Sequence, residues 1–101
     1  MQGINVIDYA TLDVLDDAVT SLTVSASPTL PDQAKRAFIT NETAAIRWRA
    51  DGTDPDVNEG HLLAANASIS FTGANYRQLL EKIRFIADTV THGALKITYF
   101  D

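Results

Sequence analysis

The densest group of side chains able to do chemistry is an acidic run between residues 51 and 60. Four carboxylates and one asparagine lie within nine positions there, namely Asp51, Asp54, Asp56, Asn58 and Glu59. Calcium prefers carboxylate and amide oxygens, which makes the four acids (Asp51, Asp54, Asp56 and Glu59) candidate ligands. Their spacing does not match an EF-hand loop, and Asp-Gly and Asp-Pro pairs are ordinary turn formers. We therefore expect a solvated loop without a metal. A contact loop is the preferred functional interpretation, because exposed loops often carry recognition residues.

Two arginines precede this run, on either side of a tryptophan. In an extended strand Arg47 and Arg49 share one face, while Trp48 points to the other. Guanidinium groups bind carboxylates and phosphates in a planar, bidentate manner, so this pair can hold an acidic neighbouring subunit or a phosphate. The alternative is salt bridging within the same sheet, to Glu42 or Asp51. Both interpretations stay open, and an acidic protein surface is preferred to nucleic acid as the partner.

The remaining candidates for catalysis are isolated from one another. His61 and His92 are far apart in the sequence and lack a nucleophile motif, so no triad is predicted. A zinc pair would require the fold to bring them together with a carboxylate. Asp16 and Asp17 are adjacent, so on a strand they face opposite sides and cannot flank one bond. The chain contains no Gly-rich phosphate loop, HExxH or GxSxG motif, and we expect no enzyme activity, no catalytic residue and no cofactor.

The composition is that of one small globular domain. The chain has 101 residues, of which 46% are hydrophobic and 21% charged. The absence of cysteine excludes disulfide scaffolds, zinc–thiolate sites, iron–sulfur clusters and thiol nucleophiles. A net charge of -5 argues against a duplex-binding module, which normally carries a basic stripe. Neither a secretory signal nor an apolar run long enough to span a bilayer is apparent, so we expect folding in a cytoplasm without membrane contact.

Most of the sequence alternates with a period of two, which is typical of half-buried β-strands. Clear alternation covers residues 19–25, 45–50, 68–72 and 94–100, and a noisier pattern covers 4–9 and 34–41. Short strands separated by turn residues predict an all-β fold, an antiparallel sandwich of the jelly-roll or immunoglobulin kind. The aromatic side chains expected in its core are Phe38, Trp48, Phe71, Tyr76 and Phe85. Tyr99 and Phe100 point in opposite directions, so we expect one of them at an interface.

One segment follows a different period. Apolar side chains are spaced as on one face of a helix that Asn75 can cap, at positions 76, 79, 80, 83, 86 and 87. The alternative is a strand over 82–87, paired across a loop with residues 95–100. Periodicity alone slightly favours the helix.

Several stretches together resemble a known group of proteins. They are "IRWRADGTDP" at 46–55, "GHLL" at 60–63 and the alternating end of the chain at 94–100. Over residues 18–101 the chain resembles small β-sandwich proteins encoded among the structural genes of tailed bacteriophages and prophages. The first 17 residues fall outside the resemblance and are expected to form an N-terminal arm or the first strands. In that family the region before the final strand is extended, so we predict one short helix near 75–81 followed by a strand. The family has no catalytic residues to carry over.

The resemblance implies a structural virion protein that is made in the host cytoplasm. A capsid decoration or cement subunit on the major capsid protein is the preferred role, or another head-associated accessory, with a connector or tail component as the close variant. We also expect a homo-oligomer, because a core this small leaves room for contacts between copies. The predicted interface residues are Arg47, Arg49, Asp54, Asp56 and Phe100. The alternative is a carbohydrate-binding β-sandwich module, which requires exposed stacking aromatics that the alternation does not favour.

Overall fold

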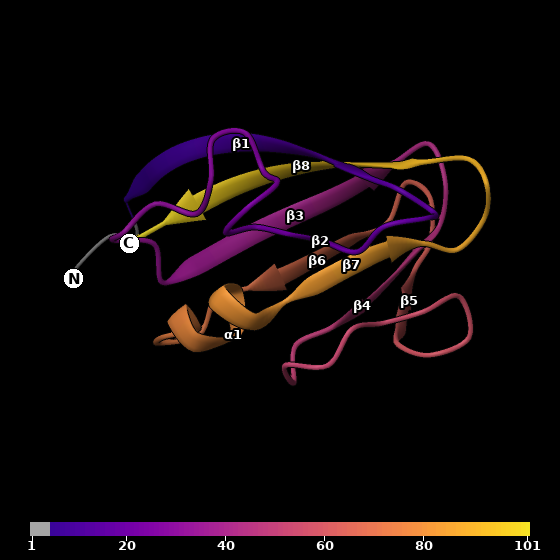
Figure 1. Cartoon of the computed structure of the whole chain (residues 1–101). Coiled ribbons are helices and arrows are strands. Elements are labelled where there is room, and N and C mark those ends of the chain that lie inside the picture. Colours follow the sequence, from indigo (N-terminus) through magenta and orange to yellow (C-terminus); the bar gives the residue numbers. More distant parts are fainter. Residues whose placement is uncertain (1–4) are drawn as a thin grey trace.

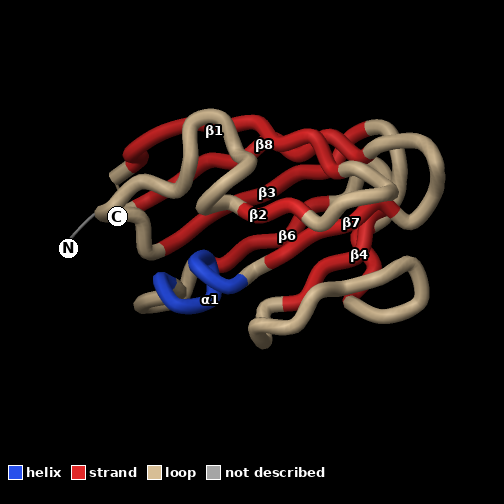
Figure 2. Tube along the Cα trace, in the orientation of Figure 1, coloured by secondary structure: helices blue, strands red, loops and turns tan. Residues whose placement is uncertain are grey.

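The computed structural model describes residues 5–101, which form a sandwich of two four-stranded antiparallel sheets (Figure 1). The first sheet has the order β1-β8-β3-β6, with β1 at Val6–Val14, β8 at Gly93–Phe100, β3 at Arg36–Glu42 and β6 at Ser68–Phe71. The second has the order β2-β7-β4-β5, with β2 at Thr20–Ser21, β7 at Arg84–Ala87, β4 at Ile46–Arg49 and β5 at His61–Leu63. The helix of the described region, α1, spans Arg77–Lys82 (Figure 2). The prediction of an all-β sandwich is confirmed.

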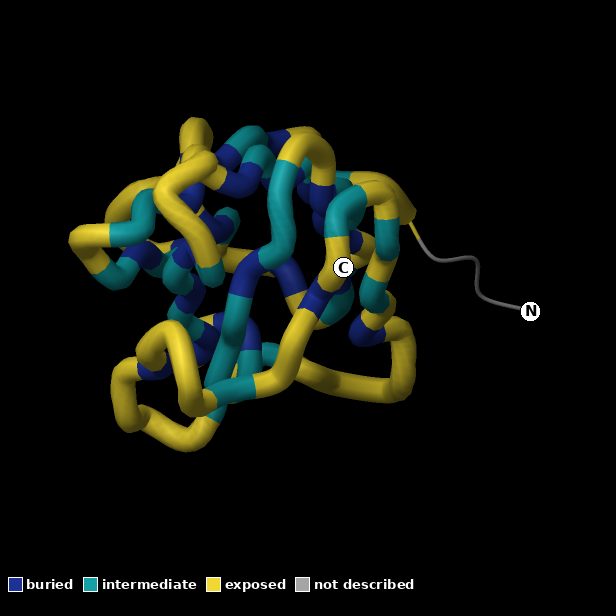
Figure 3. The backbone as a smooth tube through the Cα atoms, turned by 90° about the vertical axis from the view of Figure 1, so that its right-hand side faces the viewer, coloured by how far each residue is buried: buried dark blue, intermediate teal, exposed yellow. Residues whose placement is uncertain are grey.

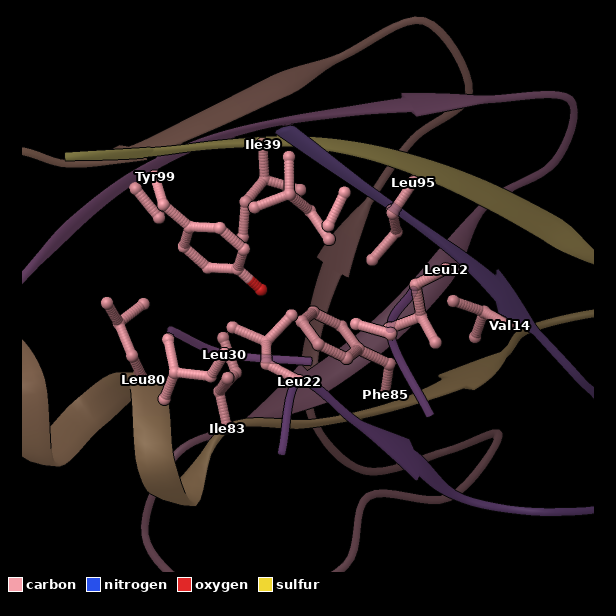
Figure 4. Close-up of a cluster of buried hydrophobic side chains, with 14 of the residues drawn as sticks. Leu12, Val14, Leu22, Leu30, Ile39, Leu80, Ile83, Phe85, Leu95 and Tyr99 are labelled. Atoms are coloured by element: carbon pink, nitrogen blue, oxygen red, sulfur yellow. The ribbon is translucent and has the colours of Figure 1, made fainter. Parts of the chain in front are cut away.

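The core forms where the inward faces of the two sheets meet. Along β8, Leu95, Ile97 and Tyr99 are fully buried, while the residues between them are partly exposed. β1 continues the same inward layer, because Leu12 lies opposite Leu95 in the sheet register. From the second sheet and α1 come buried residues such as Phe85 and Leu80 (Figure 4). Burying one large aliphatic side chain contributes roughly 1.5–3 kcal/mol, so this layer stabilises the sandwich most. Exposed residues concentrate in the surrounding loops (Figure 3).

The start of the described chain belongs to the sandwich itself. Residues 6–14 form β1, which pairs with β8 along its length. The other edge of β1 is partly covered, since Thr11 and Ser27 exchange two backbone hydrogen bonds of 3.0 and 2.8 Å. Of the expected strand at 4–9, residue 4 lies outside the described residues, and the observed strand runs five residues further.

Two strand predictions need correction, and one observed strand was not predicted. The strand expected over 19–25 is only two residues long, because the chain turns after Ser21 and leaves Val24 78% exposed. β7 does not pair with β8; it pairs with β2 and β4, because residues 88–92 carry the chain across from the second sheet to the first. β5 was not predicted at all, since three residues with an exposed Leu62 give no readable alternation.

The helix followed by a strand is observed where it was expected. Asn75 Oδ1 accepts a hydrogen bond of 2.9 Å from the Arg77 backbone N–H, which satisfies one donor of the first turn. Arg77 also donates to the main-chain oxygens of Pro31 and Ala34 and pairs with Glu81 one turn on. The fully buried side chain of Leu80 packs this short helix against the sandwich.

The aromatic core is smaller than the sequence predicts. Phe71 and Phe85 are buried and Trp48 is half-buried, but Phe38 is 40% exposed and Tyr76 is 36% exposed. Phe38 alternates with the buried Ala37 and Ile39 on β3, so it must point away from the core.

Tyr99 places a hydroxyl in this core without a hydrogen-bond partner among residues 5–101. Figure 4 shows its oxygen pointing into the apolar cluster. Burial, with a smaller effect of the Asp8 charge, raises the pKa of Tyr99 well above its ordinary value. Tyr99→Phe is expected to raise the free energy of unfolding by about 1 kcal/mol, because it removes an unpaired buried polar group. Urea unfolding measures it, with Tyr9→Phe as the control at an exposed tyrosine. Destabilisation by Tyr99→Phe alone would contradict the prediction.

Candidate functional site

The acidic run forms the long loop of a β-hairpin. β4 and β5 pair through Ile46 with Leu63, Arg47 with Leu62 and Trp48 with His61, and residues 50–60 connect them. We call this connection the hairpin loop. Its tip is closed by hydrogen bonds of 2.9 and 3.2 Å between the backbones of Asp56 and Glu59. Pro55 is buried beneath it. The loop therefore has internal supports and a defined path.

Gly60 is the residue that returns the hairpin loop to β5. Its φ of +131° lies in the region that L side chains rarely adopt. A Cβ there would stand 3.0 Å from the Trp48 carbonyl oxygen and 3.2 Å from Pro55 Cβ. Glycine allows the loop to close tightly against β4, which explains the glycine before His61.

Three arginines on the outer face of the second sheet each have an intramolecular carboxylate partner. Arg49 binds Asp51 through two hydrogen bonds of 3.1 and 2.5 Å. The other two pairs are Arg47 with Asp88 at 3.1 Å and Arg84 with Asp54 at 2.6 Å. For Arg49, the structure therefore shows one of the two alternatives that the sequence left open, the salt bridge to Asp51. Arg47 also has an intramolecular partner, but it is Asp88 and not Glu42.

The calcium candidates do not converge on one point. Asp51 and Asp54 are directed at different arginines, and Asp56 and Glu59 face each other through their backbones. Among residues 5–101, no three histidine, cysteine, aspartate or glutamate side chains are placed to hold a metal ion. His92 lies in a separate loop, with Nε2 3.5 Å from Asp16 Oδ1, so it does not join His61 in a zinc pair.

The hydrogen-bonded pair of Arg49 and Asp51 is expected to lower the pKa of the Asp51 carboxyl group measurably. Chiefly the hydrogen bonds from Arg49, and then one from the Thr53 backbone N–H, lower the pKa of Asp51 from 3.8 to about 2. Arg49→Gln is expected to return this pKa toward 3.8, followed by carboxyl carbon NMR during acid titration. The pKa of Asp51 is lower in the folded state than in the unfolded state. The stability that the pair contributes is therefore fully present above pH 3.8 and is lost as the pH falls through about 2. Arg47→Gln is the control, and an equal shift in both variants would contradict the assignment to Arg49.

An open groove of about 620 Å³ lies between the hairpin and α1. Its apolar lining comes from Trp48, His61 and Leu79, and its polar lining from Arg49, Asp51 and Glu59. Trp48 and His61, a cross-strand pair, have ring centroids 4.6 Å apart. Behind them, Phe71 meets Trp48 edge-on at 5.7 Å and 84°, which fixes the indole in place. Sequence analysis assigned no role to His61. The one signal for its contact with Trp48 was that a hairpin could pair the two residues across its strands.

Comparisons with known proteins do not assign this chain to a family. No protein-family model, curated protein or solved structure shows significant similarity to this chain. The described region contains no helix that is long and apolar enough to cross a membrane.

The predicted interface residues do not form one surface. Arg47, Arg49, Asp54 and Asp56 belong to the hairpin side of the second sheet. Phe100 lies on the outer face of the first sheet, since its neighbour Tyr99 points into the core. Two further aromatics face outward on the adjacent strands, Tyr9 at 54% and Phe38 at 40% exposure, with Thr98 between them in the register. We call Tyr9, Phe38, Thr98 and Phe100 the aromatic face.

Proposed function

We propose that this chain is a structural protein of a tailed-phage virion, a head-associated accessory subunit that docks on the major capsid protein. Two lines of reasoning support this role. The residues that carry the family resemblance, 46–55 and 60–63, coincide with the β4–β5 hairpin and its supported loop. The second is a set of partly exposed aromatic side chains on the outer face of the other sheet.

We assign the docking surface for the capsid to the aromatic face. Three aromatic side chains on three adjacent strands, β1, β8 and β3, are partly exposed on the outer face of the first sheet. Aromatic residues are enriched in protein interfaces and often supply most of their binding energy. Ser70 and Thr98 lie opposite Phe38 in the register, and such uncharged side chains are desolvated more easily than charged ones. Arg36 lies opposite Phe100, with its guanidinium donating to the main-chain oxygens of Gly73, Ala74 and Asp101. Many copies on one capsid lattice also add avidity, so each contact can be weak.

The first experiment asks whether the chain is a virion component. Particles are purified from cells that carry the encoding phage or prophage, heads and tails are separated, and the proteins are quantified by mass spectrometry. We expect the chain in the head fraction at a fixed ratio to the major capsid protein. Its presence only in tails moves the role to the connector or tail, and its absence from particles overturns the proposal.

The second experiment tests the docking surface. Purified protein is added to capsids that lack it, and bound copies are measured after sedimentation. We expect the double variant Tyr9→Ser with Phe38→Ser to reduce bound copies at least about tenfold, because it removes two central apolar contacts. Val24→Ser is the matched control, since Val24 is 78% exposed in the loop after β2, outside the aromatic face. Equal losses in both variants, or none in either, would count against the aromatic face.

A further inference from the structure

We propose that the groove between the hairpin and α1 binds a neutral saccharide, with one pyranose ring stacked on Trp48. The site is independent of the docking role, because its residues lie outside the aromatic face. Each part of the groove lining satisfies one requirement of sugar recognition.

The floor of the groove is a rigid aromatic surface. Trp48 is half-buried, with Phe71 packed against it edge-on and the His61 ring partly stacked on it, 4.6 Å away and tilted by 37°. Leu79 of α1 extends the apolar lining. The C–H bonds on one face of a pyranose carry partial positive charge, and an aromatic face carries partial negative charge. A fixed indole therefore offers a stacking position that costs little side-chain entropy on binding.

The rim of the groove supplies hydrogen-bonding groups at the edge of that surface. The Asp51 carboxylate is held in place by two hydrogen bonds from Arg49, and its oxygens keep further lone pairs for ligand hydroxyls. The Glu59 side chain makes no ion pair with any residue from 5 to 101 and lines the same groove. Hydroxyl groups of a sugar both donate and accept, so a rim of carboxylates and a guanidinium can satisfy them.

The charge of the lining decides between ligand classes. Arg49 is neutralised by Asp51, and Glu59 leaves the rim with one excess negative charge. This disfavours phosphates, sulfated or acidic sugars and nucleic acid, because like charges repel. The volume of about 620 Å³ lies within the range of small-molecule sites and has room for more than one sugar ring. A neutral oligosaccharide satisfies the apolar floor and the acidic rim together.

The test uses Trp48 as its own reporter. Trp48 is the sole tryptophan of the chain, so intrinsic fluorescence and the indole N–H signal in NMR both report on this groove. The 101-residue chain is titrated with maltotriose, cellotriose, mannotriose and N,N′,N″-triacetylchitotriose, each to about 20 mM, so that a Kd of about 1 mM gives near-saturation. An arginine-containing pentapeptide and glucose 6-phosphate are titrated in parallel. We expect saturable changes with at least one neutral trisaccharide and none with the phosphate.

Two variants assign the binding to the groove without disturbing the core. Glu59→Gln and His61→Ala, at exposed positions, are each expected to weaken binding at least fivefold. Glu42→Gln is the matched control at an exposed glutamate of β3, and its affinity should be unchanged. Absence of saturation with every neutral trisaccharide, unchanged affinity in both variants, or binding of the arginine peptide alone would overturn the proposal. The variants should keep their capsid binding, so a failed saccharide site leaves the virion role standing.

Discussion

Replacing Asn41 with leucine is expected to lower the free energy of unfolding by about 3 kcal/mol, because the buried Leu63 carbonyl and the partly buried Ala44 carbonyl lose the donor that Asn41 supplies. Asn41 is fully buried near the end of β3. Its Nδ2 group faces three main-chain oxygens, those of Ala44 at 2.8 Å, Leu63 at 3.1 Å and Ala64 at 3.2 Å. One amide thus ties the β3–β4 turn and the end of β5 to the first sheet.

A second variant at the same position separates lost hydrogen bonds from lost packing. Asn41→Asp keeps the shape but directs a carboxylate at the same three oxygens, so we expect a larger loss than with leucine at neutral pH. The repulsion favours the protonated acid in the folded state and raises its pKa, so the stability of this variant should recover as the pH falls toward the ordinary value of the carboxyl group. Urea unfolding at several pH values measures both variants. Asn58→Asp, at an exposed position of the hairpin loop, is the control and should change stability by less than about 0.5 kcal/mol.

Gly93→Ala is expected to destabilise the protein by about 3 kcal/mol through overpacking. Gly93 is buried at the start of β8. A Cβ there would stand 2.3 Å from Ile46 Cγ2, well inside van der Waals contact, and Ile46 itself is fully buried in the opposite sheet. The two sheets approach each other so closely at this point that either the strand or the isoleucine must move.

A double-mutant cycle tests this cause. Ile46→Leu removes the β-branch that carries Cγ2 while conserving volume, at an expected cost below about 1.5 kcal/mol on its own. In that background Gly93→Ala should cost at least about 1 kcal/mol less than in the natural chain, which urea unfolding measures directly. Additive effects of the two substitutions would show that the clash with Ile46 is not the reason for glycine at this position.

The architecture was predictable from sequence where one strand face is apolar over several residues. β8 shows this best, since Leu95, Ile97 and Tyr99 alternate with polar neighbours and all three are buried. The short helix followed by β7 was also correct. The partners of β7 were not predictable, because alternation states which face is buried but not which strand lies alongside. The two-residue β2 and three-residue β5 are held by their neighbours in the second sheet and carry too little pattern of their own.

The candidate sites were predictable only as separate segments. The acidic run was identified as a loop, and one of the two alternatives for Arg49 is its observed pair with Asp51. The groove was missed, because Trp48 was assigned to the core and His61 had no assigned role. Their contact depends on the register of the β4–β5 hairpin, which is set after a long loop that no local rule specifies. The aromatic face was missed for a similar reason. Tyr9 and Phe38 come to lie on one face of the sheet only because β1 and β3 both pair with β8, where both residues lie opposite Thr98.

The position of β8 also affects how the protein folds during synthesis. β8 lies between β1 and β3, so the two earlier strands have no direct hydrogen-bonded contact in the first sheet. Until residues 93–100 leave the ribosome, β1 and the β8-facing edge of β3 lack their native partner. Pairing of such distant segments is slow relative to local folding, and unpaired strand edges promote aggregation. A chain truncated before β8 should therefore remain unfolded and be a chaperone client rather than a smaller stable sandwich.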